Sequence, residues 1–240
     1  MCAEKCAAQF NISREQQDHY TTETYRRAQH AVDNNFFQEI VPVSVKQRQR
    51  GGGDDTLTTI TKDEEPHSLN LHKLATLKPA FDRNNGTVTA ANASSLNDGA
   101  SAMVIMTQDQ ANDMGITPLA KILGFADAET APLDFTIAPS LAVPIALDNA
   151  GVTAQDVDYH EINEAFSVVA LANMQLLGLD HSNVNVFGGA VALGHPIGMS
   201  GARIIGTLYS VLKHRDATVG CASICNGGGG ASAIVIERLS

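Results

Sequence analysis

Three residue types with reactive or polar side chains stand out in the C-terminal half of the chain: a histidine, a cysteine and an asparagine. Asn163 begins the segment Asn163-Glu-Ala-Phe166, His195 lies in the glycine-rich segment 188–201, and Cys225 precedes four glycines within the next five residues. Each segment begins where a predicted strand ends. In α/β sheets, ligands bind at the carboxyl ends of the strands. An imidazole, a thiol, an amide and backbone N–H donors together are typical of acyl transfer.

Each of these residues also has a purely structural interpretation. His195 could be a loop histidine whose hydrogen bonds are satisfied, and Cys225 could precede a tight hairpin turn. Asn163 could be an ordinary helix N-cap, followed by Glu164 as a partner of the helix dipole in the first turn. For Cys225 the functional alternative is a thiol surrounded by backbone N–H groups, which lower a thiol pKa or hold an oxyanion. The presence of all three residues favours function.

The glycine-rich segment does not fit the common cofactor motifs. Its Gly-x-x-x-Gly-x-x-Gly spacing from Gly194 is not the G-x-G-x-x-G of dinucleotide sites, and His195 stands where a P-loop requires lysine. Cys221 and Cys225 are separated by Ala-Ser-Ile, whereas structural zinc uses tighter C-x-x-C knuckles. We therefore expect no nicotinamide, flavin or zinc cofactor.

Strands and helices alternate along the second half of the chain. Near the start, Ser13 and Gln16 fit a capping box that opens a helix to about residue 34. Hydrophobic patterns and stop signals predict strands over 119–125, 157–162, 218–224 and 231–237 and helices over 140–150, 164–177 and 200–213. Shorter strands are predicted over 86–90, 184–186 and, as a buried strand, 102–106. This alternation predicts a layered α/β fold.

Composition excludes several classes of protein. The 240 residues carry a formal net charge of −10, and 44% of them are hydrophobic. The acidic balance argues against a nucleic-acid partner, which needs a basic face. No apolar run approaches the ~20 residues of a membrane span, so we expect no membrane segment. The first residues resemble neither a signal peptide nor a transit peptide.

Four segments together resemble the thiolase family. Three of them are Asn163-Glu-Ala-Phe166, the glycine-rich segment around His195, and Cys225-Asn-Gly-Gly-Gly-Gly-Ala231; the fourth is 85–100, which resembles a block that contacts coenzyme A. The resemblance implies a layered αβαβα fold. It further implies that residues 1–115 are a remnant of the N-terminal domain and coenzyme A loop region, and that 116–240 are the C-terminal domain.

The family's roles can be transferred to matching positions. His195 resembles the base that activates the nucleophilic cysteine, and Cys225 the acid/base that moves a proton at the acetyl methyl carbon or the leaving thiolate. Asn163 would position an oxyanion-hole water, and Gly227 would supply a backbone N–H to a second oxyanion hole. Lys73 and Ser94 match coenzyme A contacts. The residues that match a potassium site are Tyr25, Ala90, Ala91, Ala93 and Val191.

The implied activity is that of an acetyl-CoA C-acetyltransferase: thiolytic cleavage of acetoacetyl-CoA and the reverse condensation of two acetyl-CoA. The spelling Cys225-Asn-Gly-Gly-Gly-Gly-Ala is similar to that of the mitochondrial acetoacetyl-CoA thiolases and implies a mitochondrial location. The family forms dimers and tetramers, so we expect a homo-oligomer when the protein is full length.

Two departures from the family qualify this expectation. Ser68-Leu-Asn70 stands where the family has an arginine that contacts the nucleotide, and no Cys-Ala-Ser-Gly nucleophile block is present. We therefore expect an N-terminally truncated thiolase that does not turn over alone. One alternative is a non-catalytic short chain that binds coenzyme A or associates with full-length subunits; another is a cysteine hydrolase that uses Cys225 and His195.

Overall fold

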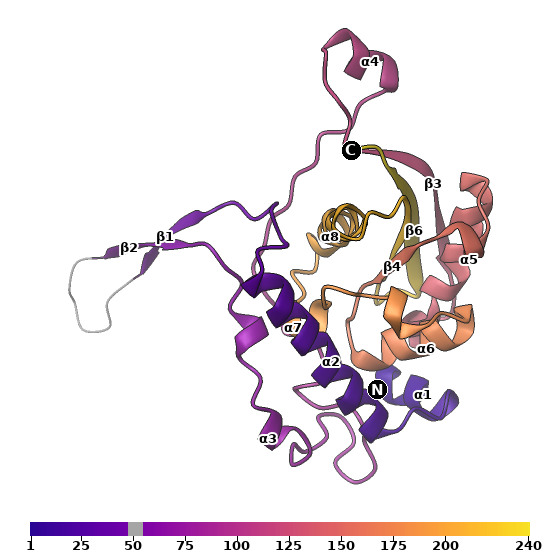
Figure 1. Ribbon diagram of the computed structural model, residues 1–240. Coiled ribbons are helices and arrows are strands. Elements are labelled where there is room, and N and C mark those ends of the chain that lie inside the picture. The colour runs from indigo at the N-terminus through magenta and orange to yellow at the C-terminus, as the bar shows by residue number, and fades with distance from the viewer. Residues whose placement is uncertain (48–54) are drawn as a thin grey trace.

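A four-stranded sheet forms the centre of the C-terminal half. The computed structural model describes residues 1–47 and 55–240. The strands are β3 (Ala120–Glu129), β4 (Tyr159–Ile162), β5 (Val219–Cys225) and β6 (Gly230–Arg238), in the order β3-β6-β5-β4. β4 and β5 run parallel, and the other neighbours are antiparallel (Figure 1). These strands confirm the four longer strands predicted from the hydrophobic pattern, with shifts of a few residues at their ends.

Helices α5 (Pro139–Ala150) and α8 (Ser200–His214) cover opposite faces of this sheet (Figure 1). Side chains alternate between the two faces along a strand. Cys221 packs in the cluster on the α5 side, whereas its neighbour Ala222 packs in the cluster on the α8 side. The helix α5 ends at Gly151, whose φ of +70° provides the left-handed C-cap. The sheet is therefore the middle layer between two helices.

The N-terminal helices pack against α6 (Ser167–Leu177) rather than against the sheet. They are α1 (Cys2–Gln9) and α2 (Arg14–Asp33). The predicted capping box at the start of α2 is confirmed: Ser13 Oγ accepts from the Gln16 amide at 3.2 Å, and Gln16 Oε1 accepts from the Ser13 amide at 2.7 Å. Buried alanines of α1 meet Val168 and Ala172 of α6. This packing places α2 beside the loop that precedes α6.

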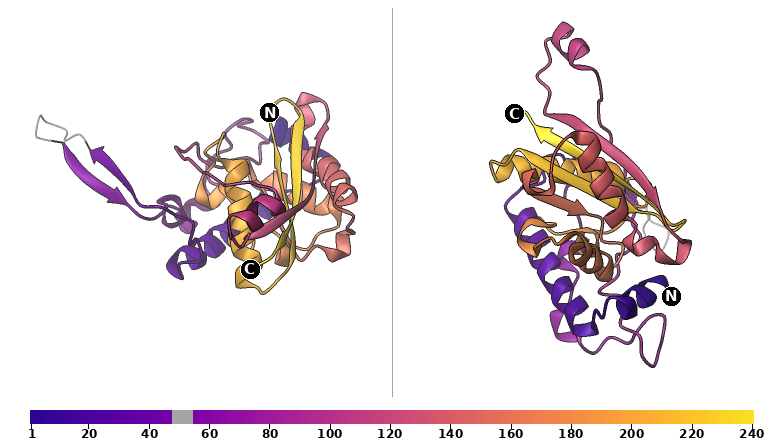
Figure 2. Two further views of the ribbon diagram at one scale, coloured as in Figure 1. Left: turned by 90° about the horizontal axis from the view of Figure 1, so that it is seen from above. Right: turned by 90° about the vertical axis from the view of Figure 1, so that its right-hand side faces the viewer.

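A two-stranded hairpin extends away from the rest of the chain (Figure 2, left). Its strands are β1 (Val43–Gln47) and β2 (Thr56–Ile60), paired antiparallel. The short elements are η1 (Glu65–His67), α3 (Leu71–Leu74), α4 (Gln108–Asp113), η2 (Pro132–Ile137), η3 (Ala154–Asp156), η4 (His181–Asn183) and α7 (Ala190–Leu193). In the part of the chain that the structure describes, no helix combines the length and apolar character needed to cross a bilayer.

Three short strands predicted from the sequence are wrong. Residues 102–106 form no strand, and Val104 and Ile105 are 86% and 75% exposed, because no described strand lies beside them to pair with their backbone. Residues 86–90 form no strand, since the amides of Thr87 and Val88 donate to the Glu4 carboxylate instead of to a neighbouring strand. Residues 184–186 contribute one isolated bridge, between Val184 and His160.

Candidate active site

Asn163 directly follows β4. It lies at the carboxyl end of that strand, beside the carboxyl end of the parallel strand β5. The backbone N–H of Asn163 donates to the Ser223 carbonyl oxygen of β5 at 2.9 Å, and the residue is 2% exposed. The predicted helix over 164–177 begins later than expected: α6 starts at Ser167 with Phe166 as its N-cap. The structural interpretation of Asn163 as an N-cap is therefore wrong, because three loop residues separate it from the helix.

The side chains of Asn163 and His195 meet. Asn163 Nδ2 lies 3.4 Å from His195 Nε2, and His195 Nδ1 lies 2.6 Å from Ser200 Oγ. An amide NH2 only donates, so this contact requires Nε2 to be the acceptor and Nδ1 to carry the proton. The imidazole then donates to Ser200 and directs its basic nitrogen toward Asn163. Burial lowers the pKa of His195, and the charge of Arg203 lowers it further, so the ring is neutral at pH 7.

The backbone around His195 is anchored on both sides. The His195 amide donates to the Ser95 carbonyl at 2.9 Å and to Asn97 Oδ1 at 3.2 Å. Gly194 has a φ of +87°, and a Cβ atom there would lie 2.2 Å from Asn97 Oδ1. Arg203, one turn into α8, donates to the Gly194 carbonyl at 3.1 Å. Segments far apart in the sequence therefore fix the imidazole in one place.

Cys225 is the last residue of β5 and is 8% exposed. Burial raises the pKa of its thiol to about 12. A nucleophilic cysteine needs a lowered pKa, whereas a thiol with a raised pKa keeps its proton at pH 7 and can donate it. In the described part of the chain, no hydrogen bond joins Cys225 to His195. These facts favour an acid/base role for Cys225 and argue against the cysteine hydrolase.

The glycines after Cys225 form a tight loop between β5 and β6. Asn226 Oδ1 accepts from the Gly228 amide at 3.0 Å, and the Asn226 amide donates to the Gly230 carbonyl at 2.8 Å. Gly227 borders open space, since a Cβ atom at this position would meet none of the described residues within 4 Å. The predicted hairpin turn is thus confirmed, and Gly227 is placed where a ligand could approach its backbone.

Glu164 is the residue that sequence reasoning missed. It is 0% exposed, and Tyr20 and Thr24 of α2 donate to its carboxylate. The expected role as a first-turn dipole partner is wrong, because Glu164 precedes α6 and points into the interior. No local pattern signals this environment, since its partners lie more than 20 residues away in the sequence.

The two predicted coenzyme A contacts lie in different surroundings. The amide and the hydroxyl of Ser94 both donate to the Ala165 carbonyl, at 3.1 and 3.0 Å, so Ser94 lies against the loop that follows Asn163. Lys73 belongs to the short helix α3 and is exposed. Of the two, Ser94 is therefore the one that the structure brings close to the candidate site.

The five predicted potassium ligands do not form a single cluster. Tyr25 and Val191 pack together in one hydrophobic cluster, whereas Ala93 packs against another and pairs with Phe166. Ala91 is buried and Ala90 is exposed. Apart from the Tyr25 hydroxyl, these residues offer only backbone carbonyl oxygens as ligands. Such oxygens can replace the hydration shell of potassium. The described residues contain no group of three His, Cys, Asp or Glu side chains that could hold a metal ion.

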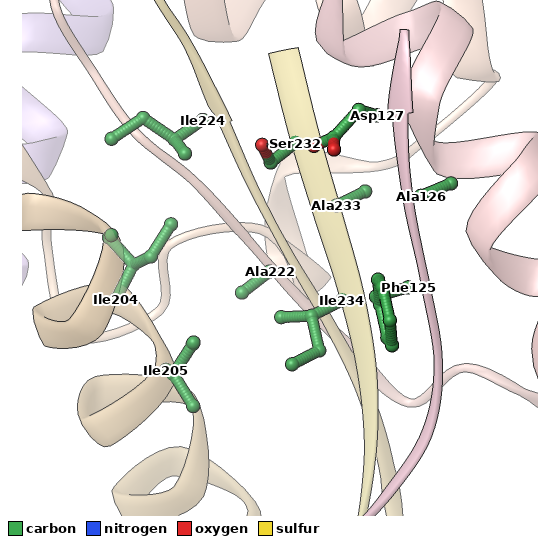
Figure 3. A pocket seen from close by; sticks show the side chains of 11 residues that line it. Phe125, Ala126, Asp127, Ile204, Ile205, Ala222, Ile224, Ser232, Ala233 and Ile234 are labelled. Atoms are coloured by element: carbon green, nitrogen blue, oxygen red, sulfur yellow. Dashed lines mark hydrogen bonds between the residues drawn. The ribbon is translucent and has the colours of Figure 1, made fainter. Parts of the chain in front are cut away.

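An apolar pocket of about 300 Å³ lies beside the candidate site, between α8 and the sheet (Figure 3). Ile204 and Ile205 of α8 face Ile234 of β6 across it, and Phe125 closes one side. None of the candidate catalytic residues lines it. The pocket therefore offers apolar surface next to the site but not the site's chemistry.

Comparison with known proteins decides the family. Residues 116–238 match the family described as "Thiolase, C-terminal domain", and residues 1–109 match "Thiolase, N-terminal domain". The chain belongs to the thiolase family. The resemblance of the four sequence segments is thereby confirmed, and so is the layered α/β fold, because a solved thiolase superimposes closely. That structure, Acat5 thiolase from Ascaris suum in complex with coenzyme A, is 44% identical with a TM-score of 0.87.

Two curated thiolase relatives are similar along almost the whole chain. "Acetyl-CoA acetyltransferase ERG10, cytosolic" from Gibberella zeae is 52% identical over 237 residues. "Acetyl-CoA acetyltransferase A, mitochondrial" from Xenopus laevis is 51% identical over 239 residues. Each match covers 99% of this chain, but only 59% and 55% of these relatives and 59% of the Ascaris structure. This thiolase chain thus spans less than two thirds of the proteins it matches.

Proposed function

We propose that this chain carries the proton-transfer and oxyanion-binding part of an acetyl-CoA C-acetyltransferase site. The observation that carries the proposal is the 3.4 Å contact of Asn163 with His195, at the sheet edge where the strand of Cys225 also ends. The names of the curated relatives, acetyl-CoA acetyltransferases, support acetyl-CoA as the substrate. The coenzyme A complex of the Ascaris thiolase supports a coenzyme A thioester as the ligand.

Each residue has a chemical task in this proposal. Condensation and thiolysis place negative charge on carbonyl oxygens, which preorganised donors stabilise. Asn163 and His195 would serve one such oxygen, directly or through a water, and the Gly227 amide would serve another. Cys225 would exchange a proton with the methyl carbon of the acetyl group, for which a base close to the carbon in a dry site is needed. Because the raised pKa keeps Cys225 as a thiol at pH 7, it would first give its own proton to a departing coenzyme A thiolate or to solvent; the thiolate so formed is a strong base and can take a proton from the methyl carbon.

We propose that turnover requires a nucleophilic cysteine that residues 1–240 do not supply. The sequence contains no Cys-Ala-Ser-Gly block, and the high pKa of Cys225 makes it a poor substitute. Loss of thiolysis alone would therefore not contradict the assignment. What this chain is expected to retain is binding of the thioester and removal of a methyl proton.

Other parts of the assignment are proposals on the same footing. Lys73 and Ser94 are proposed coenzyme A contacts, and Tyr25, Ala90, Ala91, Ala93 and Val191 are proposed potassium ligands. The division at residues 115/116 is the proposed domain boundary, and a dimer or tetramer is the proposed assembly of the full-length protein. A mitochondrial location is proposed with the Xenopus relative in support, although the Gibberella relative is named cytosolic.

The test measures proton exchange rather than turnover. The purified chain is incubated with acetyl-CoA in D2O, and deuterium in the acetyl methyl group is followed by mass spectrometry. We expect exchange by the wild-type chain, its loss in Cys225→Ala, and no cleavage of acetoacetyl-CoA by either. Equal exchange with and without the cysteine would overturn the role of Cys225. Absence of both exchange and coenzyme A binding would overturn the proposed site.

A second candidate function is association with other thiolase subunits without catalysis. Met103, Val104 and Ile105 form a run of exposed apolar residues, and Met103 lies against α8 beside Gly206. Contiguous exposed apolar surface marks sites of association. Size-exclusion chromatography with and without a full-length thiolase discriminates, because a stable monomer that does not co-elute would contradict this function.

A further inference from the structure

The buried carboxylate of Glu164 collects hydrogen bonds from four residues. Oε1 accepts from the Tyr20 hydroxyl at 2.6 Å and from Asn185 Nδ2 at 2.9 Å. Oε2 accepts from the Val191 amide at 3.1 Å, and the Thr24 hydroxyl lies 3.0 and 3.1 Å from the two oxygens. Burying a charge in this way is costly unless it is fully hydrogen-bonded, which this carboxylate is.

The direction of each hydrogen bond in this group is fixed. Thr24 Oγ1 accepts from the Gly189 amide at 2.9 Å, so its own hydrogen is free to go to Glu164. Tyr20 likewise accepts from Asn185 Nδ2 at 3.2 Å and donates to Glu164. Every neighbour is therefore a donor, and a protonated carboxyl would bring a hydrogen that has no acceptor. Burial raises the pKa of Glu164, and these four donors oppose the rise.

The hydrogen bonds of Glu164 connect the loop that contains Asn163 with α7, the helix that precedes His195. Glu164 directly follows Asn163, so its carboxylate holds the loop of that residue. Val191 lies in α7, the helix that leads into His195 four residues later. Gly189, the N-cap of α7, allows the close approach, since a Cβ atom there would lie 2.2 Å from the Glu164 carboxyl carbon. One side chain thus fastens α7, α2 and the Asn163 loop together.

We propose that Glu164 is a positioning residue that sets the contact between Asn163 and His195 by holding α7 against the Asn163 loop. Its importance for the reaction rests on the proposed function. The positioning itself does not, because it is a statement about the geometry of Asn163, Val191 and His195. The two can therefore be tested separately.

The variant Glu164→Gln separates the bonds of this carboxylate. The glutamine oxygen best takes the Oε1 position, where Tyr20, Asn185 and Thr24 donate. Its NH2 then faces the Val191 amide, so two donors meet and the Val191 bond is lost. We expect the link from Glu164 to α7 to break while the link to Tyr20 and α2 remains.

The test is NMR spectroscopy of the chain labelled with 15N. In Glu164→Gln we expect the Val191 amide hydrogen to shift upfield and to exchange about tenfold faster, as expected for loss of one hydrogen bond to a charged group. The ring 15N signals of His195 should move toward a mixture of tautomers as the contact with Asn163 is lost. The matched control is Glu161→Gln, since Glu161 is also buried, at 3% exposed, but its Oε1 has no hydrogen-bond partner among the residues that the structure describes. This control should leave both sets of signals in place.

A second pair of variants decides the proposal if Glu164→Gln does not fold. Thr24→Ala removes the hydroxyl that joins Glu164 to Gly189, and Thr24→Ser retains it. The alanine variant should shift the His195 signals, and the serine variant should restore them. Unchanged Val191 and His195 signals in a folded Glu164→Gln chain would overturn the proposal. So would shifts in Glu161→Gln as large as those in Glu164→Gln, or shifts in Thr24→Ser as large as those in Thr24→Ala. If the wild-type chain fails to exchange the acetyl proton while these NMR shifts occur, the proposed function fails and the positioning stands.

Discussion

Two glycines in the loop after Cys225 should respond in opposite ways to the same substitution. Gly229 has a φ of +100°, and a Cβ atom there would lie 2.3 Å from the Thr130 carbonyl oxygen. Gly227 has no positive φ, and within the described part of the chain a Cβ atom there would contact nothing within 4 Å. Comparing Gly229→Ala with Gly227→Ala therefore isolates the effect of the backbone conformation and the close contact.

The expected free energies follow from this geometry. At Gly229 the left-handed conformation costs alanine about 1–3 kcal/mol. Relieving the clash would also strain the bond from the Thr130 amide to the Gly229 carbonyl, 2.9 Å long, at a cost of about 1 kcal/mol. Both variants gain about 0.4–1 kcal/mol from the reduced freedom of the unfolded chain. We expect Gly229→Ala to lose about 1–4 kcal/mol and Gly227→Ala to gain a few tenths or more.

Urea denaturation followed by far-UV circular dichroism measures this difference. At equal slopes, the midpoint should fall in Gly229→Ala and stay level or rise in Gly227→Ala. The two variants then separate stability from function, since Gly227→Ala should stay folded while it perturbs the proposed oxyanion site. Midpoints that differ by less than the equivalent of about 0.5 kcal/mol would refute the reasoning.

Further predictions concern protons. Ser200→Ala removes the acceptor of the His195 Nδ1 proton, so the ratio of His195 tautomers should change by up to about tenfold toward Nε2–H. Long-range 1H–15N correlation spectra measure this ratio, and an unchanged ratio would contradict the assigned tautomer. Because burial raises the pKa of Cys225 to about 12, its alkylation by iodoacetamide should keep accelerating above pH 9, whereas an ordinary thiol levels off there, and a plateau near pH 9 would contradict the burial. Burial lowers the pKa of His160 to about 4. The unfolded chain therefore binds the extra proton first as the pH falls, and His160 should account for a loss of about 3 kcal/mol of stability between pH 6.5 and 4. His160→Leu should remove this part of the slope and leave the part that comes from His181, whose pKa is also lowered to about 4; an unchanged slope would contradict the prediction.

Local signals in the sequence were sufficient for the long elements. The helix α2 begins at Ser13 because the capping box needs only residues three apart, and α5 ends at Gly151 because a left-handed C-cap favours glycine. The strands β5 and β6 show apolar residues on both faces, as expected of a sheet covered on both sides. These features depend on neighbours in the sequence and are therefore readable from it.

Short apolar segments were misjudged for a definite reason. Residues 102–106 have the composition of a buried strand, but a strand forms only beside a partner, and the described part of the chain provides none there. The same holds for 86–90, where a carboxylate from α1 takes the amides that a strand would pair. Pairing is a property of two segments, so one segment's composition cannot settle it.

The sequence by itself determined the chemistry that this chain can offer: the types and order of Asn163, His195 and Cys225, and the glycines that follow. It also determined the elements that end beside them, because caps, turns and hydrophobic periodicity act over a few residues. Only the tertiary structure decided that Asn163 faces His195 Nε2, that burial keeps Cys225 protonated, and that Glu164 joins two distant segments. The physical reason is that hydrogen-bond geometry and desolvation depend on residues that are far apart along the chain and become neighbours only on folding.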